Sequence, residues 1–153
     1  MLNKREEIEK AIYLDLENCF HGYWVTLNTL GTTKYSLEFL VAELSKRLNR
    51  YCYGRSFIQN STAGLRIVGV VERGSFNQGL HIHLLIMEKI SCSKSLVNID
   101  LFIRKNWYQL IGANGSFYGI LVDVQPVGDL ESRIKYMCKT CWCLKHDFNP
   151  IYF

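Results

Sequence analysis

The chain has 153 residues and a formal net charge of +4, with 48% hydrophobic and 21% charged residues. This composition excludes a disordered or fibrous protein, and the length suits one domain with a substantial core. No apolar run is long enough to span a bilayer, and the N-terminal residues lack the apolar segment of a secretory signal. We therefore expect a single domain over residues 1–153 without a membrane partner, located in the cytoplasm or, in a eukaryotic host, the nucleus.

The charge and the cysteines narrow the function only slightly. A net charge of +4 permits a polyanionic partner but does not require one. Cysteines form a disulfide framework mainly in secreted proteins, so we expect reduced thiols here. The cysteines are Cys19, Cys52, Cys92, Cys138, Cys141 and Cys143.

Helices and strands are predicted to alternate along the chain. Apolar residues at helical spacing indicate the helices, and runs rich in β-branched and aromatic residues indicate the strands. In chain order we expect a helix at about 3–20, a strand at 23–29, a helix at 36–51, a loop at 52–63, strands at 64–72 and 79–86, a helix at about 94–111, a strand at 117–125 and a helix at about 129–143.

The strand at 79–86 carries two histidines, His81 and His83, set one residue apart. Successive side chains of a strand point to opposite faces, so both imidazoles emerge on one face, roughly 6.6 Å apart along the strand. The opposite face is entirely apolar, with Leu80, Ile82, Leu84 and Ile86. This pattern predicts a sheet with a buried back and a chemically active front.

A carboxylate is expected beside these histidines. If residue 72 faces residue 79 across the turn, Glu72 lies on the histidine face, diagonal to His81. Two imidazoles and one carboxylate form a three-ligand set that leaves positions open on Mg²⁺ or Mn²⁺. The alternative is that the histidines are ordinary hydrogen-bonded sheet residues and Glu72 a solvated strand end.

The last predicted helix carries a candidate nucleophile. Tyr136 and Lys139 are three residues apart and therefore share a helix face. An ammonium group beside a phenol favours the phenolate, or binds the phosphate that the phenol attacks. The alternative is an amphipathic tyrosine at the edge of the core.

The strand predicted at 117–125 also contributes polar side chains. By strand alternation, Asp123 and Gln125 are expected to point toward the front.

Three segments together resemble the histidine-hydrophobic-histidine (HUH) endonucleases that initiate rolling-circle replication. Residues 23–29, Tyr-Trp-Val-Thr-Leu-Asn-Thr, are similar to the family's first motif, which ends near Thr-Leu-Thr, with Asn28 at a position for a polar residue. Residues 79–84 are similar to the metal motif, and residues 136–139 to the nucleophile motif Tyr-x-x-Lys of single-tyrosine members. Glu72 falls where the family often supplies its third ligand.

The resemblance implies an α+β fold with a five-stranded antiparallel sheet and flanking helices, akin to RNA-recognition-motif-like and ferredoxin-like folds. It also implies metal-dependent, site-specific nicking and strand transfer of single-stranded DNA. Tyr136 would form a 5′-phosphotyrosine and release a 3′-hydroxyl that primes replication of a phage, virus or plasmid, and Lys139 would stabilise the phenolate or the phosphate. The implied partners are a single-stranded origin or hairpin and a host or fused helicase, whose domain would lie outside this chain.

Two other functions stay open at this point. A single-tyrosine insertion-sequence transposase would use the same histidines and a helical tyrosine, although Lys139 favours the replication group. A non-catalytic nucleic-acid-binding module would instead hold zinc near the C-terminus. The ligands of that zinc would be Cys138, Cys141, Cys143 and His146, although the usual paired spacing of zinc ligands is missing.

Residues that contact DNA are predicted from charge and from aromatic character. Cations bind phosphates, and unpaired bases stack on aromatic rings, although each such residue is also explained as a solvated surface group. The principal candidates are Asn28, Arg55, Arg66, Arg133 and Lys135. Further candidates are Arg47, Arg50, Arg104 and Lys105 for phosphates, and Tyr53, Phe57 and Trp142 for bases.

Overall fold

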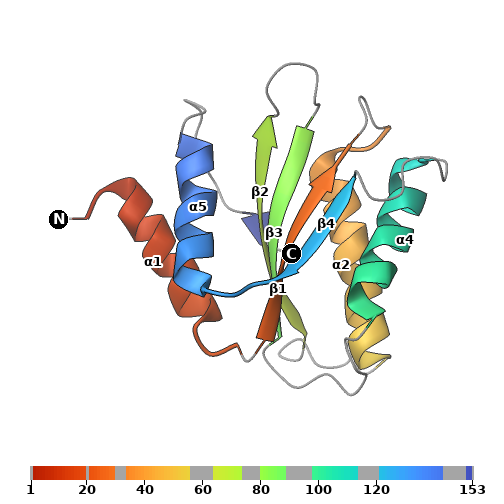
Figure 1. Cartoon of the computed structure of the whole chain (residues 1–153), viewed down its shortest axis with the longest axis horizontal. Helices are drawn as coiled ribbons and strands as arrows, with labels where there is room; N and C mark the ends of the chain where they lie inside the picture. Colours follow the sequence, from red (N-terminus) through yellow and green to blue (C-terminus); the bar gives the residue numbers. More distant parts are fainter. Residues whose placement is uncertain are drawn as a thin grey trace.

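A β-sheet lies between two pairs of helices in the computed structural model of the chain, with α1 and α5 on one face and α2 and α4 on the other (Figure 1). The structure describes residues 2–19, 21–29, 34–55, 64–73, 80–88, 98–113, 121–142 and 151–152. The helices are α1 (Lys4–Leu16), α2 (Leu37–Tyr53), α4 (Ile99–Ile111) and α5 (Leu130–Trp142). The strands are β1 (His21–Asn28), β2 (Leu65–Arg73), β3 (Leu80–Glu88), β4 (Val122–Pro126) and β5 (Ile151–Tyr152).

The sheet has the order β4-β1-β3-β2-β5, and every neighbouring pair is antiparallel. This confirms the α+β class with an antiparallel sheet and flanking helices. The resemblance implies a five-stranded sheet, whereas four strands of five to nine residues form it, and β5, with only two residues, pairs with the edge strand β2. The chain runs β1-α2-β2-β3-α4-β4, with β1 and β3 in the centre.

Several predicted boundaries move by a few residues. The first helix ends at Leu16 rather than near residue 20, and it begins after Asn3, whose side chain and that of Glu6 form a capping box. The strand β4 begins at Val122, and residues 117–120 of the predicted strand lie outside the described residues. So do most of the predicted loop at 52–63, the turn after β2 and the start of the helix predicted at 94.

The back of the sheet forms the larger core. The apolar stripe that predicts α2 is buried there against β1 and β3, together with one face of α4. The buried stripe of α2 consists of Leu37, Leu40, Val41, Leu44, Leu48 and Cys52. The expected buried back of β3 is confirmed for Ile82, Leu84 and Ile86, whereas Leu80 at the strand end is 41% exposed.

The front of the sheet is also partly covered by helices. Leu85 and Met87 of β3 are buried there against residues of α1 and α5, including Leu16 and Met137. Strands buried on both faces read as continuous apolar runs, and residues 84–87 are such a run. The part of the front nearest the start of β3 carries the polar side chains of His81 and His83.

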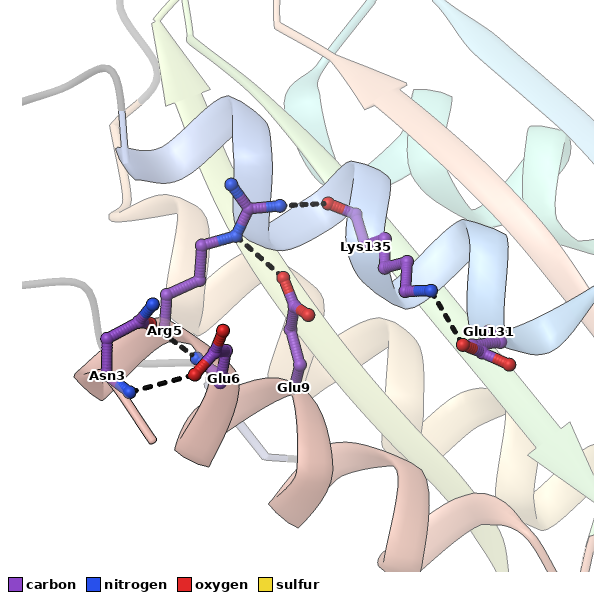
Figure 2. A network of polar contacts seen from close by, with 6 residues as sticks. All are labelled: Asn3, Arg5, Glu6, Glu9, Glu131 and Lys135. Carbon is purple, nitrogen blue, oxygen red and sulfur yellow. Dashed lines mark hydrogen bonds and ion pairs between the residues drawn. The ribbon is translucent and has the colours of Figure 1, made fainter. Parts of the chain in front are cut away.

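Polar contacts supplement the packing of α1 on α5 (Figure 2). The Arg5 guanidinium donates to the Lys135 carbonyl at 3.4 Å and pairs with Glu9, while Lys135 pairs with Glu131 on its own helix. Exposed ion pairs of this kind contribute little each, so the buried apolar contacts fix α5 on the sheet. In the part of the chain described, no helix combines the length and the hydropathy that crossing a bilayer requires.

Candidate active site

The pairing of β2 with β3 places a carboxylate directly across from a histidine. Glu72 faces His81, and Val70 faces His83. The predicted register, with Glu72 diagonal to His81, is therefore wrong by two residues. Side chains alternate with a period of two, so this shift keeps Glu72 on the predicted face. The face assignment of all three residues is confirmed.

The three side chains converge on one point. The Oε2 atom of Glu72 lies 3.0 Å from Nε2 of His81 and 3.0 Å from Nε2 of His83. The potential ligand atoms all lie within 4.8 Å of one another, and this is the one such His, Cys, Asp or Glu group found among the described residues. Two nitrogens and one carboxylate oxygen suit a divalent metal ion with open coordination positions.

A hydroxyl on the neighbouring strand orients His83. Thr26 lies opposite His83 in the pairing of β1 with β3, and its Oγ1 is 3.0 Å from Nδ1 of that ring. This contact turns Nε2 of His83 toward Glu72. Burial lowers the pKa of His83 below its ordinary value, the hydrogen bond that its ring donates to Glu72 opposes this shift, and the nearby His81 adds to it. A depressed pKa favours the neutral imidazole, which is the form that binds metals.

The candidate nucleophile lies beside this group. The ring of Tyr136 is 5.8 Å from the ring of His83 and 5.8 Å from that of Trp24, at 81° to both. Trp24 stacks on His83 with ring centres 5.1 Å apart and an interplanar angle of 19°. Tyr136 is 50% exposed, so a macromolecular substrate can reach it. Lys139 is exposed one turn further along α5.

Two predicted DNA contacts lie at the site. Asn28 faces His81 across the β1–β3 pair, and its carbonyl accepts a hydrogen bond from the Trp107 indole at 2.9 Å, which anchors the end of β1. The Arg133 guanidinium lies over the Trp24 ring, with its carbon 5.1 Å from the ring centre. Asn28 therefore lies beside His81, and Arg133 lies beside Trp24, which stacks on His83.

Three other predicted contacts lie elsewhere. Arg66 is on the front of the sheet but six residues before Glu72 on β2, about 20 Å along the strand. Arg55 follows α2, whose C-terminal half bonds to the start of β2 through Asn49 and is therefore at the opposite end of the sheet. Lys135 pairs with Glu131 near α1, as Figure 2 shows.

Two of the four additional cations, Arg47 and Arg104, have structural partners. Arg47 donates to Asn106 at 3.1 Å and so links α2 to α4. Arg104 pairs with Asp100 at 2.6 Å and also donates to the Val122 carbonyl. Arg47 therefore connects two helices, and Arg104 connects α4 to the edge strand β4. Neither lies at the site.

The sequence interpretation missed Trp24 and Thr26 as site residues. The signal was present, since Trp24, Thr26 and Asn28 alternate along β1 and must share a face. Asp123 and Gln125 of β4 do occupy the front as expected. Asp123 faces Thr26, and Gln125 donates to Asp123 at 2.8 Å.

The alternative zinc site is disfavoured by the one ligand whose side chain is described. Cys138 is 1% exposed within the front core, and burial raises the pKa of its thiol to about 11. Zinc binds the thiolate, which such burial opposes. The side chains of Cys141, Cys143 and His146 lie outside the described part of the chain. Cys19, Cys52 and Cys138, the cysteines whose side chains are described, are not joined by disulfides.

Comparisons with known proteins add one structural similarity. No protein-family model and no curated protein sequence matches the chain. Among solved structures, the chain is similar to the hypothetical protein ORF119 from Sulfolobus islandicus rod-shaped virus 1, at 12% sequence identity and a TM-score of 0.49. The similarity covers 96% of this chain and 98% of that one.

Proposed function

We propose that this chain is a single-tyrosine HUH endonuclease, which nicks and rejoins single-stranded DNA to initiate rolling-circle replication. One observation carries the proposal: Glu72, His81 and His83 meet at a shared carboxylate oxygen, and the Tyr136 ring lies 5.8 Å from His83. These residues come from β2, β3 and α5, so the fold brings together motifs that are separate in sequence. The β-α-β-β-α-β succession with strand order 4-1-3-2 also supports the expected ferredoxin-like core.

The donor set fits Mg²⁺ or Mn²⁺. Glu72, His81 and His83 offer one oxygen and two nitrogens within 4.8 Å of one another, and the Thr26 contact orients one of the imidazoles. When bound, a divalent ion would polarise a phosphate oxygen and offset the charge that develops during attack. The carboxylate of Glu72 carries a negative charge, and this charge favours a bound cation between Glu72 and the two histidines.

Transesterification requires no further reactant. The phenol oxygen of Tyr136 attacks phosphorus, and the bond from phosphorus to the 3′-oxygen breaks. The phenol loses one proton in this step, and the leaving 3′-oxygen gains one. The products are a 5′-phosphotyrosine and a free 3′-hydroxyl, and reversal of the step rejoins a strand. Lys139, one turn from Tyr136, stabilises the phenolate or the phosphate through its positive charge.

Formation of a covalent adduct tests this function. The wild-type chain, incubated with Mn²⁺ and a pool of labelled single-stranded oligonucleotides, is expected to give a protein–DNA adduct that survives denaturing electrophoresis. Tyr136→Phe should abolish the adduct, whereas Tyr13→Phe, which alters an exposed tyrosine of α1, should retain it. Absence of an adduct with the wild type over a broad pool, or its persistence in Tyr136→Phe, would refute the assignment.

The metal ligands are tested separately. His81→Ala and His83→Ala are each expected to remove divalent-dependent cleavage, because each variant removes a nitrogen from the three-donor set. Circular dichroism checks that the variants remain folded. Unchanged cleavage in either folded variant would show that the histidines are not ligands.

A further inference from the structure

Arg133 is fixed in place by three contacts. Its Nε donates to the Val127 carbonyl at 3.2 Å, and its Nη2 donates to Oε1 of Gln125 at 3.2 Å. The guanidinium carbon lies 5.1 Å from the centre of the Trp24 ring, a cation–π distance. Gln125 is itself held by its 2.8 Å bond to Asp123. The guanidinium is therefore preorganised rather than a mobile surface charge.

These contacts leave the positive charge of Arg133 uncompensated in the part of the chain that the structure describes. Its partners there are a carbonyl, an amide and an aromatic ring, none of which carries a negative charge. Among these residues no contact engages the remaining N–H groups, including both on Nη1, so the outer side of the guanidinium is available to an anion. Arginine presents such donors in a planar arrangement that matches phosphate oxygens.

The position of Arg133 relates it to the nucleophile. Arg133 and Tyr136 are one turn apart on α5, and both contact Trp24, at 5.1 Å and 5.8 Å from its ring centre. Lys139 follows Tyr136 by another turn. Each three-residue step advances about 4.5 Å along a helix axis. One cation therefore precedes the tyrosine and one follows it, which suits a strand whose successive phosphates pass along this side of α5.

We propose that Arg133 binds the DNA phosphate adjacent to the one that Tyr136 attacks and so sets the position of the strand. This inference rests on the proposed function, because it takes single-stranded DNA as the ligand. Hydrogen bonds to Val127 and Gln125 orient the guanidinium, which also makes a cation–π contact with the Trp24 ring. Arg133 is thus a substrate contact, and it adds a second cation to the role given to Lys139.

Paired charge removals on α5 test this contact. Arg133→Gln and Lys135→Gln each remove one positive charge from the same helix, but Lys135 pairs with Glu131 near α1 and away from the site. Binding of a fluorescein-labelled oligonucleotide is measured by anisotropy at several salt concentrations, in a Tyr136→Phe background without divalent metal. Under these conditions binding is separated from cleavage.

We expect Arg133→Gln to weaken binding about tenfold and to reduce the slope of log K against log salt by about 0.7, the value for one phosphate on a single strand. Lys135→Gln should change the slope by less than half of that. Arg133→Lys keeps the charge and should keep most of the slope. In the protein that retains Tyr136, however, this variant should raise the KM for DNA, because lysine lacks the planar guanidinium donors of arginine. This variant also controls for a loss of packing on Trp24.

Equal slopes for Arg133→Gln and its Tyr136→Phe parent would overturn the contact, as would equal effects of Arg133→Gln and Lys135→Gln. Either result, obtained while the wild-type chain forms its adduct, leaves the proposed function intact. A selective loss of slope in Arg133→Gln without any wild-type adduct would instead retain the phosphate contact and refute the nuclease.

Discussion

Removing the Thr26 hydroxyl should weaken metal binding without removing a ligand. In Thr26→Val the side chain keeps its shape, but Nδ1 of His83 loses the partner that lies 3.0 Å away. The hydroxyl suits both states of the ring. It can donate to Nδ1 when Nε2 carries the proton toward Glu72, and it can accept from Nδ1 when Nε2 is needed as a metal ligand. Valine can do neither.

The expected magnitudes follow from this geometry. Loss of an outer partner of a metal-binding histidine typically costs 10–100-fold in affinity, which is about 1.4–2.8 kcal/mol. His83 is 7% exposed, so water does not readily replace the hydroxyl. An unsatisfied buried group costs about 1–3 kcal/mol, which in a chain of this size lowers the melting temperature by roughly 2–12 °C. Thr26→Ser keeps the hydroxyl and should recover most of both losses.

Titration of the protein with Mn²⁺, with free Mn²⁺ followed by electron paramagnetic resonance, measures the affinity directly. The expected order is wild type, Thr26→Ser and then Thr26→Val, with the last at least tenfold weaker. If valine and serine variants both bind Mn²⁺ as tightly as the wild type, the hydroxyl does not orient His83. Equal losses in the two variants would instead attribute the effect to packing of the γ-methyl group.

Three further changes test the site and its support. Glu72→Gln should reduce Mn²⁺ affinity by more than about a hundredfold, since it removes the charged ligand, and calorimetric titration with Glu131→Gln as the exposed control checks this. Gly22→Ala should lower the free energy of unfolding by about 1–3 kcal/mol in urea titrations, because a Cβ there would overlap the Met87 sulfur and lie 2.9 Å from the backbone oxygen of Ile86. The thiol of Cys138 has a pKa of about 11 in the folded chain against 9.0 ordinarily, so the unfolded state releases its proton first and stability falls as pH rises from about 9 to 11. Denaturation at several pH values should show the difference between wild type and Cys138→Ala shrinking by about 2 kcal/mol over that window, and a constant difference would contradict the assignment.

Local patterns in the sequence predict most of the elements and the face on which the candidate ligands lie. The period-two alternation of β3 places His81 and His83 together, and the helical stripe of α2 predicts the residues that are buried there. Both signals depend on neighbours within one element. Strand register depends instead on contacts between two elements. The prediction paired Glu72 with residue 79, whereas the structure pairs it with His81, two residues further along.

The cover over the front of the sheet was the harder feature to predict. The first helix contributes only Ile12 and Leu16 as fully buried residues, so its apolar stripe is weak. The position of α1 on the sheet depends on its packing against α5, whose residues Ile134, Met137 and Cys138 are buried. The contacts of Trp24 with His83 and Tyr136 likewise join three elements, and no pattern within a single element contains them.

The two-sided burial of β3 determines where chemistry can occur. At Leu85 and Met87 the front is closed by α1 and α5, while at His81 and His83 the same face carries polar side chains. Tyr136 stands at this boundary because its neighbour Met137 is fully buried on the adjacent face of the same helix turn. A shift of the tyrosine toward or away from His83 would therefore require the apolar contacts of α5 to be broken. The fold thus holds Tyr136, the proposed nucleophile, at a set distance from the proposed metal ligands, as the proposed transfer of a phosphodiester would require.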